Sequence, residues 1–361
     1  MIRLLVVEDS KTVQRALVAA FEADPELEVI GTAESGEAAV EAAQRLKPDL
    51  ITMDVKLHGM DGFDATRAIM SSCPVPIVIV TGKMNPKDSA TLFRVMEAGA
   101  LMVLPKPDPV GSTGYQASVA HLIHHLKLMA EIKVVRRVFP AGDRPAGPQA
   151  AVLAPPSSPV KLVAIGASTG GPPLLRQILS GLPDRFPAAV LVVQHMAVGF
   201  TENFVHWLNN SSRLPVQLAC DGAAIAPGQV YVAPDSCHME VTPAGRIQLT
   251  LSPPEHGVRP SVSTLFRSVA LSYGRQAVGV LLSGMGKDGA LELKEIRGRG
   301  GITVAQDRES SMVFGMPGEA IQIDAAQHIL APFGIIDLLT TVTQQRASAA
   351  SKQGKGTNGQ A

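Results

Sequence analysis

The sequence predicts an α/β protein of two domains, each built on a mostly parallel sheet. Short apolar runs rich in β-branched residues alternate with amphipathic helical patterns along most of the 361 residues. A stretch rich in Pro, Gly, Ala and Ser interrupts this alternation at residues 140–159. Because a chain of this length usually forms more than one domain, and such a stretch cannot bury a core, we expect it to link two domains.

The first domain is predicted over residues 1–125, where five pairs of strand and helix follow one another. Strands are expected at 2–7, 27–33, 48–54, 75–81 and 100–106, and helices at 11–23, 36–46, 62–71, 88–98 and 115–136. Regular alternation of strand and helix is typical of a parallel sheet with crossover helices, so we expect a doubly wound (βα)5 domain. The end of the last helix and the linker then occupy residues 126–159.

The second domain is predicted over residues 160–346 and repeats the alternation with one exception. Strands are expected at 161–167, 188–194, 229–233, 277–283 and 302–306. The exception is the segment at 238–251, in which two alternating runs flank a Pro-Ala-Gly-Arg turn, the pattern of an antiparallel hairpin. We therefore expect a mostly parallel, Rossmann-like α/β sheet that carries a hairpin, followed by a polar, disordered tail at 347–361.

Charge and cysteine content disfavour several classes of function. Lys plus Arg and Asp plus Glu both total 32, which gives no general attraction to nucleic acid or to an anionic membrane surface. Cys73, Cys220 and Cys237 are odd in number and lack metal-ligand spacing, which favours reduced thiols. The apolar run at 2–7 is too short for a signal peptide, and no run is long enough to span a bilayer. We expect a cytoplasmic protein that neither inserts into a membrane nor binds nucleic acid.

Acidic and polar residues lie at the ends of four strands of the first domain. Glu8 and Asp9 follow the first strand, Asp54 ends the third, Thr81 closes the fourth and Lys106 follows the fifth. Because ligands bind at the carboxyl ends of parallel strands, these side chains are expected to form one pocket. Clustered carboxylates repel one another unless a cation offsets them, which favours an oxygen-coordinated Mg²⁺. Asp54 is then placed to accept a phosphoryl group, and the alternative is a surface cluster of ion pairs.

This set of motifs resembles the phosphoacceptor receiver domain of bacterial two-component response regulators. The matching segments are VVEDS (6–10), MDVKLHGMDG (53–62), Thr81-Gly82 and PKP (105–107). The resemblance implies Asp54 as the phosphorylation site and a chemotaxis histidine kinase as the phosphodonor. It also implies the groups that hold the metal and the phosphate: Mg²⁺ ligands Glu8, Asp9 and Asp54 with the backbone carbonyl of Lys56, and phosphate contacts Thr81 and Lys106.

Two positions depart from the pattern of that family. Leu57-His58 stands where the family usually has Met-Pro. Val103 stands three residues before Lys106, where a switch aromatic is common. We expect phosphorylation of Asp54 to survive both changes.

In the second domain, a serine lies where a predicted strand turns into a helix. Ser168 lies between Gly166 and Gly170 in a G-x-S-x-G pattern, which marks a nucleophile on such a turn. His195 follows the next strand, and Asp288 follows a later strand in a Gly-rich turn. Parallel strands bring such side chains to one sheet edge, as a Ser–His–Asp triad requires. The chain order differs from the Ser–Asp–His order of α/β-hydrolases, which disfavours that fold.

The sequence gives less support to a phosphate-binding loop at the glycine-rich turn or to a metal site at the other histidines. Residues 163–171 resemble a phosphate-binding loop, but they lack the Lys of a P-loop and the full G-x-G-x-x-G pattern. His121 and His125 lie one helical turn apart, yet no Glu follows His121 as in a zinc metalloprotease, which favours a packed or solvated helix face. Further histidines without identifiable partners are predicted to be structural: His206, His238, His256 and His328.

Segments across the second domain are similar to the catalytic domain of the chemotaxis response-regulator protein-glutamate methylesterases. They are IGASTGG (165–171), QHMAVGFTENF (194–204), APGQVYVAPDSCHMEV (226–241), GVRPSVSTLF (257–266), LLSGMGKDGA (281–290) and AQDRESSMVFGMP (305–317). The resemblance implies hydrolysis of glutamate γ-methyl esters on cytoplasmic helices of methyl-accepting chemoreceptors, with release of methanol, and deamidation of receptor glutamines. One position departs, because Ser263 stands where the family usually has Asp.

The expected reaction is that of a phosphorylation-activated serine hydrolase. Ser168 is the expected nucleophile, His195 the general base and Asp288 the group that orients the imidazole. The expected oxyanion donors are backbone amides in the Gly-rich turns: Thr169, Gly170 and Met285. Mg²⁺ is expected to serve phosphorylation only, with no cofactor for ester hydrolysis. The rival readings are a regulator of a non-chemotaxis chemosensory pathway and a non-enzymatic interaction module.

Overall fold

The structure of the protein, a computed structural model, describes residues 1–82, 96–132, 134 and 158–344. The chain forms two compact units, Met1–Arg144 and Pro145–Ala361, each with its own main sheet. The predicted helix at 88–98 lies largely outside the described residues, and so do most of the predicted linker and the predicted tail.

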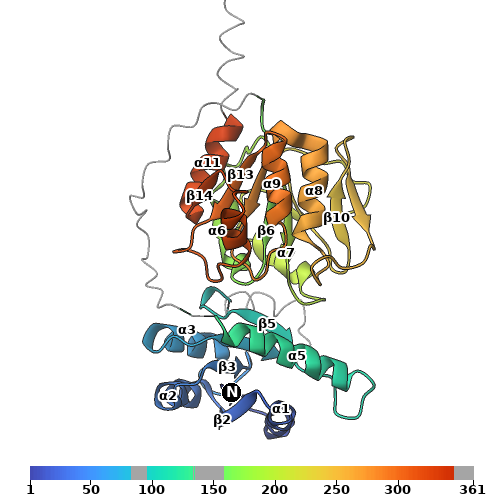
Figure 1. The fold of residues 1–361 in the computed structure, drawn as a ribbon. Helices are drawn as coiled ribbons and strands as arrows, with labels where there is room; N and C mark the ends of the chain where they lie inside the picture. Colours follow the sequence, from blue (N-terminus) through green and yellow to red (C-terminus); the bar gives the residue numbers. More distant parts are fainter. Residues whose placement is uncertain (83–95, 133, 135–157, 345–361) are drawn as a thin grey trace, which may run out of the picture. The chain divides into compact units, whose positions relative to one another are not determined.

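The first unit is built on a five-stranded parallel sheet with the strand order β2-β1-β3-β4-β5. Its strands β2, β3 and β5 are labelled in Figure 1. Its strands are β1 (Ile2–Val7), β2 (Leu27–Ala33), β3 (Leu50–Met53), β4 (Ile77–Thr81) and β5 (Met102–Pro105). All residues of β3 and β4 are buried, which explains why their sequences are continuous apolar runs without alternation. The strand order reverses between β1 and β3, and the carboxyl ends of these two strands therefore form the crevice in which such sheets bind ligands.

The described helices of this unit are α1 (Lys11–Glu22), α2 (Gly36–Leu46), α3 (Gly62–Ser72) and α5 (Tyr115–Ala130). Side-chain oxygens of Ser35 and Asp61 accept backbone N–H groups at the start of α2 and α3, which satisfies donors that a helix leaves unpaired. The helix α5 ends at Ala130, earlier than the predicted residue 136. Ile132 and Val134 follow it, and β-branched residues have lower helix propensity.

The second unit is built on a seven-stranded parallel sheet with the order β14-β13-β12-β6-β7-β9-β8. Its strands are β6 (Leu162–Ala167), β7 (Ala189–Gln194), β8 (Val216–Leu218), β9 (Val230–Val232), β12 (Ala277–Leu281), β13 (Ile302–Gln306) and β14 (His328–Leu330). The strands β10 (His238–Val241) and β11 (Ile247–Thr250) form a separate antiparallel hairpin. The predicted fold class is confirmed. The two strands that were not predicted, β8 and β14, are three-residue edge strands, too short to carry a periodic pattern.

The helices of the second unit are α6 (Gly171–Gly181), α7 (Thr201–Asn209), α8 (Val262–Tyr273), α9 (Ala290–Gly298), α10 (Met316–Gln322) and α11 (Pro332–Gln344). The helix α8 contacts the hairpin strand β10, the sheet strand β6 and the helix α9 (Figure 1). Every residue of β6 and β7 is buried. These two central strands, held in the core of the unit, position the residues that follow them.

Candidate functional site

The predicted nucleophile and base follow two neighbouring strands of the central sheet. Ala167 and Gln194, the last residues of β6 and β7, are paired in register. Ser168 and His195 therefore leave the sheet side by side, and the His195 N–H donates to the Ala167 carbonyl at 3.0 Å. The Ser168 N–H donates to the carbonyl of Ser283, just beyond β12, at 3.0 Å. The sheet thus brings Ser168 and His195 to the same edge.

Asp288 reaches the same place from the loop between β12 and α9. Its Oδ2 lies 2.9 Å from Nε2 of His195. It also accepts three hydrogen bonds from the start of α8: Oδ1 from the Ser261 hydroxyl at 2.8 Å and the Ser263 N–H at 2.9 Å, and Oδ2 from the Val262 N–H at 2.7 Å. A carboxylate at a helix N-terminus also interacts favourably with the helix dipole. Asp288 is only 3% exposed, so these contacts replace water around its charge.

The environment of Asp288 keeps it ionised. Burial alone raises the pKa of a carboxyl group. Here the hydrogen bond and charge of His195, with the N–H groups of Ser263 and Val262, outweigh burial and hold the pKa of Asp288 well below its usual range. An ionised Asp288 accepts the Nε2–H of His195 and leaves Nδ1 as the unprotonated nitrogen of the neutral ring.

Ser168 is 8% exposed, at the boundary between the sheet edge and solvent. Among the residues that the structure describes, neither its Oγ nor Nδ1 of His195 has a hydrogen-bond partner. The nucleophile and the base are therefore neighbours on the sheet edge that do not form a hydrogen bond in this structure. In hydrolases, the hydrogen bond between nucleophile and base often tightens only when substrate binds.

The turns around Ser168 depend on glycine. Gly170 has a φ of +78°, a conformation that favours glycine, and a Cβ there would lie 2.6 Å from Cβ of Met312. A Cβ on Gly284 would lie 2.8 Å from Cβ of Ser168. Because glycine occupies both positions, the segment that carries Met285 approaches the serine closely.

Within the residues that the structure describes, three backbone N–H groups in the turns next to Ser168 are unpaired. In the described part of the chain, the N–H groups of Thr169, Gly170 and Met285 donate no hydrogen bond. The Gly171 N–H, in contrast, donates to the Ser168 carbonyl at 2.8 Å. Unpaired N–H groups in Gly-rich turns are the donors from which oxyanion holes are built.

The acidic residues of the first unit gather at the crevice between β1 and β3. The Nζ atom of Lys106 lies 2.6 Å from Oδ2 of Asp54 and 2.6 Å from Oε2 of Glu8. Glu8, Asp9 and Asp54 each place one carboxylate oxygen within 4.8 Å of the others. Thr81 is buried, and its carbonyl accepts the Lys106 N–H at 2.8 Å. The five residues that the sequence places at strand ends therefore lie around one site.

The charges at this site fit a divalent cation. Burial raises the pKa of Glu8 above its ordinary value, and Lys106 offsets this only in part. Burial lowers the pKa of Lys106, but its hydrogen bonds to Asp54 and Glu8 outweigh that effect and raise it. Lys106 pairs with two of the three carboxylates at this site, those of Glu8 and Asp54. Clustered carboxylate oxygens are the ligands that Mg²⁺ prefers, so the residues present fit this ion.

The structure also shows the surroundings of His58 and Val103, which lie at the two positions that depart from the receiver pattern. Nδ1 of His58 lies 2.8 Å from Oδ2 of Asp9, and the His58 side chain is otherwise largely exposed. Val103 is a buried residue of β5. An imidazole therefore lies next to one of the three carboxylates, and an aliphatic side chain fills the position three residues before Lys106.

Several other candidates from the sequence form no such site. Nδ1 of His125 contacts the carbonyl of His121 on α5 at 2.8 Å, and among the described residues neither ring belongs to a group of side chains that could hold a metal ion. His238 is buried and bonded to backbone: Nε2 contacts the Pro253 carbonyl at 3.1 Å, and Nδ1 accepts the Ser261 N–H at 3.2 Å. Both ring nitrogens contact backbone groups, which agrees with the structural role predicted for His238.

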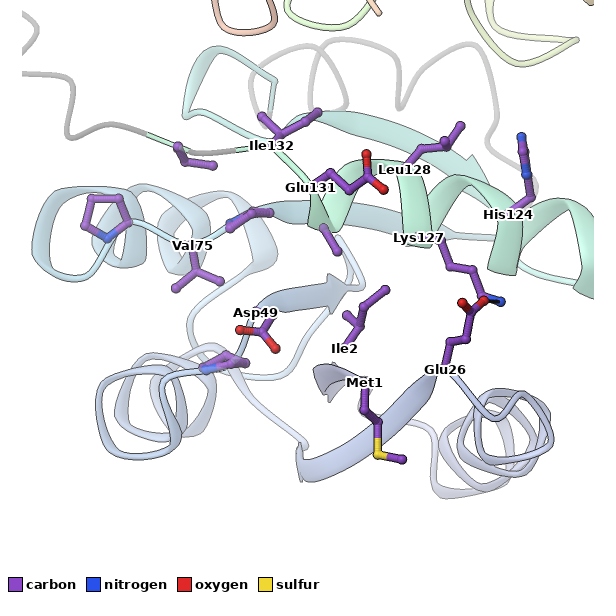
Figure 2. A pocket seen from close by; sticks show the side chains of 15 residues that line it. Met1, Ile2, Glu26, Asp49, Val75, His124, Lys127, Leu128, Glu131 and Ile132 are labelled. Carbon is purple, nitrogen blue, oxygen red and sulfur yellow. Dashed lines mark hydrogen bonds and ion pairs between the residues drawn. The ribbon is translucent and has the colours of Figure 1, made fainter.

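A separate pocket of about 980 Å³ lies in the first unit, lined by Ile2, Glu26, Asp49 and Lys127 among others (Figure 2). Lys127 of α5 forms ion pairs with Asp24 and Glu26. The pocket lies at the amino ends of the strands, whereas the acidic site lies at their carboxyl ends. It therefore belongs to neither of the two sites described above.

Comparison with known proteins identifies the family of the chain. The model of the response regulator receiver domain matches residues 4–111, and the model of the CheB methylesterase matches residues 163–339. The chain is 49% identical over 348 residues to protein-glutamate methylesterase/protein-glutamine glutaminase 4 of Geobacter metallireducens, covering 96% of this chain and 100% of that protein. The chain belongs to the CheB methylesterase family.

Further relatives agree with this assignment. A protein-glutamate methylesterase/protein-glutamine glutaminase of Nitrosospira multiformis is 48% identical and covers 96% of this CheB-type chain. The crystal structure of the Thermotoga maritima CheB methylesterase catalytic domain is 37% identical, with a TM-score of 0.50, and covers 51% of this chain and all of that one. Within the described residues, no helix has the length and apolar character that crossing a membrane requires.

Proposed function

We propose that Ser168, His195 and Asp288 carry out the reaction of this chain, which is a protein-glutamate methylesterase and protein-glutamine glutaminase of chemotaxis adaptation. The observation that carries the assignment is the contact between His195 and Asp288 on the sheet edge where Ser168 also lies. The substrates proposed are glutamate γ-methyl esters on the cytoplasmic helices of methyl-accepting chemoreceptors, which places the reaction in the cytoplasm.

The proton transfers follow from the orientation of the imidazole. Because Nε2–H of His195 donates to Asp288, Nδ1 is the nitrogen that accepts a proton from Ser168. As Oγ attacks the ester carbonyl, Nδ1 takes the hydroxyl proton and the ring becomes an imidazolium. The Asp288 carboxylate stabilises that charge and holds the ring in orientation.

Collapse of the tetrahedral intermediate completes the first half of the reaction. The imidazolium returns its proton to the leaving methoxide, which departs as methanol, and an acyl-enzyme remains on Ser168. Water then attacks this ester with His195 again as base, which releases the glutamate carboxylate. A glutamine side chain follows the same path, with ammonia as the protonated leaving group.

The oxyanion of the intermediate needs donors that are already in place. The proposed donors are the N–H groups of Thr169, Gly170 and Met285, which make no other hydrogen bond in the described part of the chain. Loss of one such donor typically costs about 3 kcal/mol of transition-state stabilisation.

The receiver domain regulates the hydrolase. We propose that Asp54 accepts a phosphoryl group from a chemotaxis histidine kinase and that this modification activates the hydrolase. Glu8, Asp9 and Asp54 would hold Mg²⁺, which neutralises charge on the transferring phosphoryl group when bound. Lys106, now paired with Asp54 at 2.6 Å, and the hydroxyl of Thr81 are the proposed phosphate contacts. Ester hydrolysis itself uses side chains and backbone amides alone.

Covalent labelling tests the assignment of the nucleophile. The full-length protein is treated with an aryl sulfonyl fluoride, and the modified residue is located by peptide mass spectrometry. The label is expected on Ser168, with methanol release lost in proportion to labelling. Full labelling at another residue with equal loss of activity would contradict the assignment.

A further inference from the structure

Gln194 directly precedes the proposed base, and its side chain contacts the backbones of both the proposed nucleophile and the proposed base. It is the last residue of β7, in register with Ala167, the last residue of β6. Ser168 and His195 are the next residues on the two strands. Gln194 is 5% exposed, so its amide lies within the protein at the level where both catalytic residues leave the sheet.

The amide nitrogen of Gln194 joins the two residues. Nε2 donates to the carbonyl of Ser168 at 2.8 Å and to the carbonyl of His195 at 2.8 Å. An amide nitrogen carries two N–H donors, so both are used. Exchange of the two ends of the amide would place Oε1 against two carbonyl oxygens, which is repulsive. The two contacts therefore fix the orientation of the side chain.

Folding stability alone does not account for a glutamine at this position. Oε1 of Gln194 is buried without a hydrogen-bond partner among the described residues, and an unpaired buried acceptor is destabilising. A Cβ on Gly171 would lie 2.2 Å from this oxygen, so the absence of a side chain at Gly171 makes room for it. The Ser168 carbonyl already accepts the Gly171 N–H and does not need a second donor.

We infer that Gln194 is a positioning residue, an amide clamp that sets the distance between the backbones of Ser168 and His195. This inference rests on the proposed roles of those two residues. No hydrogen bond joins their side chains in the described structure, so their alignment depends on where the two backbones are held. A displacement of about 1 Å in such an arrangement can cost about 100-fold in rate.

The substitution Gln194→Met tests the clamp in the full-length protein. Methionine keeps the length of the side chain and removes both donors. We expect kcat for methanol release to fall about 10- to 100-fold, with KM within about twofold of the wild-type value. We expect the same fall in the rate at which an aryl sulfonyl fluoride modifies Ser168, because that reaction needs the base but not the receptor substrate.

A matched control separates positioning from stability. Thr303→Val removes a buried hydroxyl on β13 that donates to the Ala325 carbonyl at 2.7 Å, away from the triad. It is expected to lower the melting temperature and leave kcat and the labelling rate of the folded protein unchanged. A purely structural Gln194 would behave in the same way.

A wild-type kcat and a wild-type labelling rate in folded Gln194→Met would contradict the inference that Gln194 positions the two residues. If that variant does not fold, Gln194→Asn decides on the same readouts, since it keeps a neutral amide and places its N–H donors one methylene short of the two carbonyls. Wild-type protein that neither releases methanol nor is labelled at Ser168 would contradict the proposed function instead.

Discussion

His195 meets Asp288 through Nε2, at 2.9 Å from Oδ2, and the same carboxylate is held by the first residues of α8. The helix start thus fixes the carboxylate, and the carboxylate fixes the ring. The nitrogen left for Ser168 is Nδ1. The triad residues come from three loops, but their arrangement also depends on a fourth element, the N-terminus of α8.

Asp288→Asn is expected to lower kcat for methanol release by about 10³- to 10⁴-fold. Asparagine keeps the shape of the side chain but can present an N–H group to Nε2, which favours the wrong tautomer of His195. Methanol release by the folded variant measures the effect. Activity within about tenfold of wild type would show that Asp288 does not set the tautomer.

Stability should depend on pH through Asp288. Its pKa is lower in the folded protein than in the unfolded chain, because the hydrogen bonds to His195 and to the start of α8 outweigh burial. Such a group stabilises the fold above its unfolded pKa, and the contribution is lost as pH falls towards the folded pKa. We expect the free energy of unfolding of wild type relative to Asp288→Asn to be largest above about pH 5 and to shrink towards about pH 2.

Trp207 makes this measurement specific to the second unit. It is the single tryptophan of the chain and lies on α7, so its fluorescence during urea denaturation reports on the catalytic unit. A difference between the two proteins that grows on acidification would contradict the predicted sign.

Ser261→Ala should affect both stability and catalysis. The hydroxyl caps α8 by accepting the Thr264 N–H and donates to Oδ1 of Asp288 at 2.8 Å. We expect a loss of about 1 kcal/mol of stability from the missing cap. Loss of a hydrogen bond to the carboxylate is expected to lower kcat about tenfold.

Ser35→Ala is the matched control, because Ser35 caps α2 of the first unit by the same kind of contact. It is expected to leave the basal rate of methanol release unchanged. Equal kcat values for the two alanine variants would show that the contact of Ser261 with Asp288 has no part in catalysis.

Phosphorylation should require Asp54 and Mg²⁺, and hydrolysis should not. A small-molecule phosphodonor with Mg²⁺ is expected to modify wild type and raise its rate of methanol release, and to do neither to Asp54→Asn. Lys106→Met is expected to weaken the response, since Lys106 contacts Asp54 at 2.6 Å. Intact-mass measurement reports the modification. Stimulation of unmodified Asp54→Asn by the donor, or a fall in basal hydrolysis on chelation of Mg²⁺, would contradict this division.

Much of both sites could be predicted from the sequence because parallel strands align their carboxyl ends. Strand periodicity places Ser168 and His195, and likewise Asp54 and Glu8, at the carboxyl ends of their strands and therefore at one edge of a sheet. The pairing of β6 with β7, in which Ala167 faces Gln194, is the physical basis of the first of these.

The contacts that support the triad could not be predicted in the same way. Ser261 shows a helix-capping residue type, but its contact with Asp288 depends on how α8 packs against the sheet. The amide of Gln194 bonds to backbone carbonyls, which leave no mark in the sequence. The partners of His238 are likewise backbone groups distant in the chain.

The most direct test of the account is methanol release from methylated chemoreceptor cytoplasmic fragments by wild type and Ser168→Ala. Ser180→Ala is the control, since this serine on α6 bonds only to the Gln177 carbonyl in the described structure. We expect release by wild type and by the control, and none above background from folded Ser168→Ala. Substantial release by folded Ser168→Ala would contradict the assignment of Ser168 as the nucleophile.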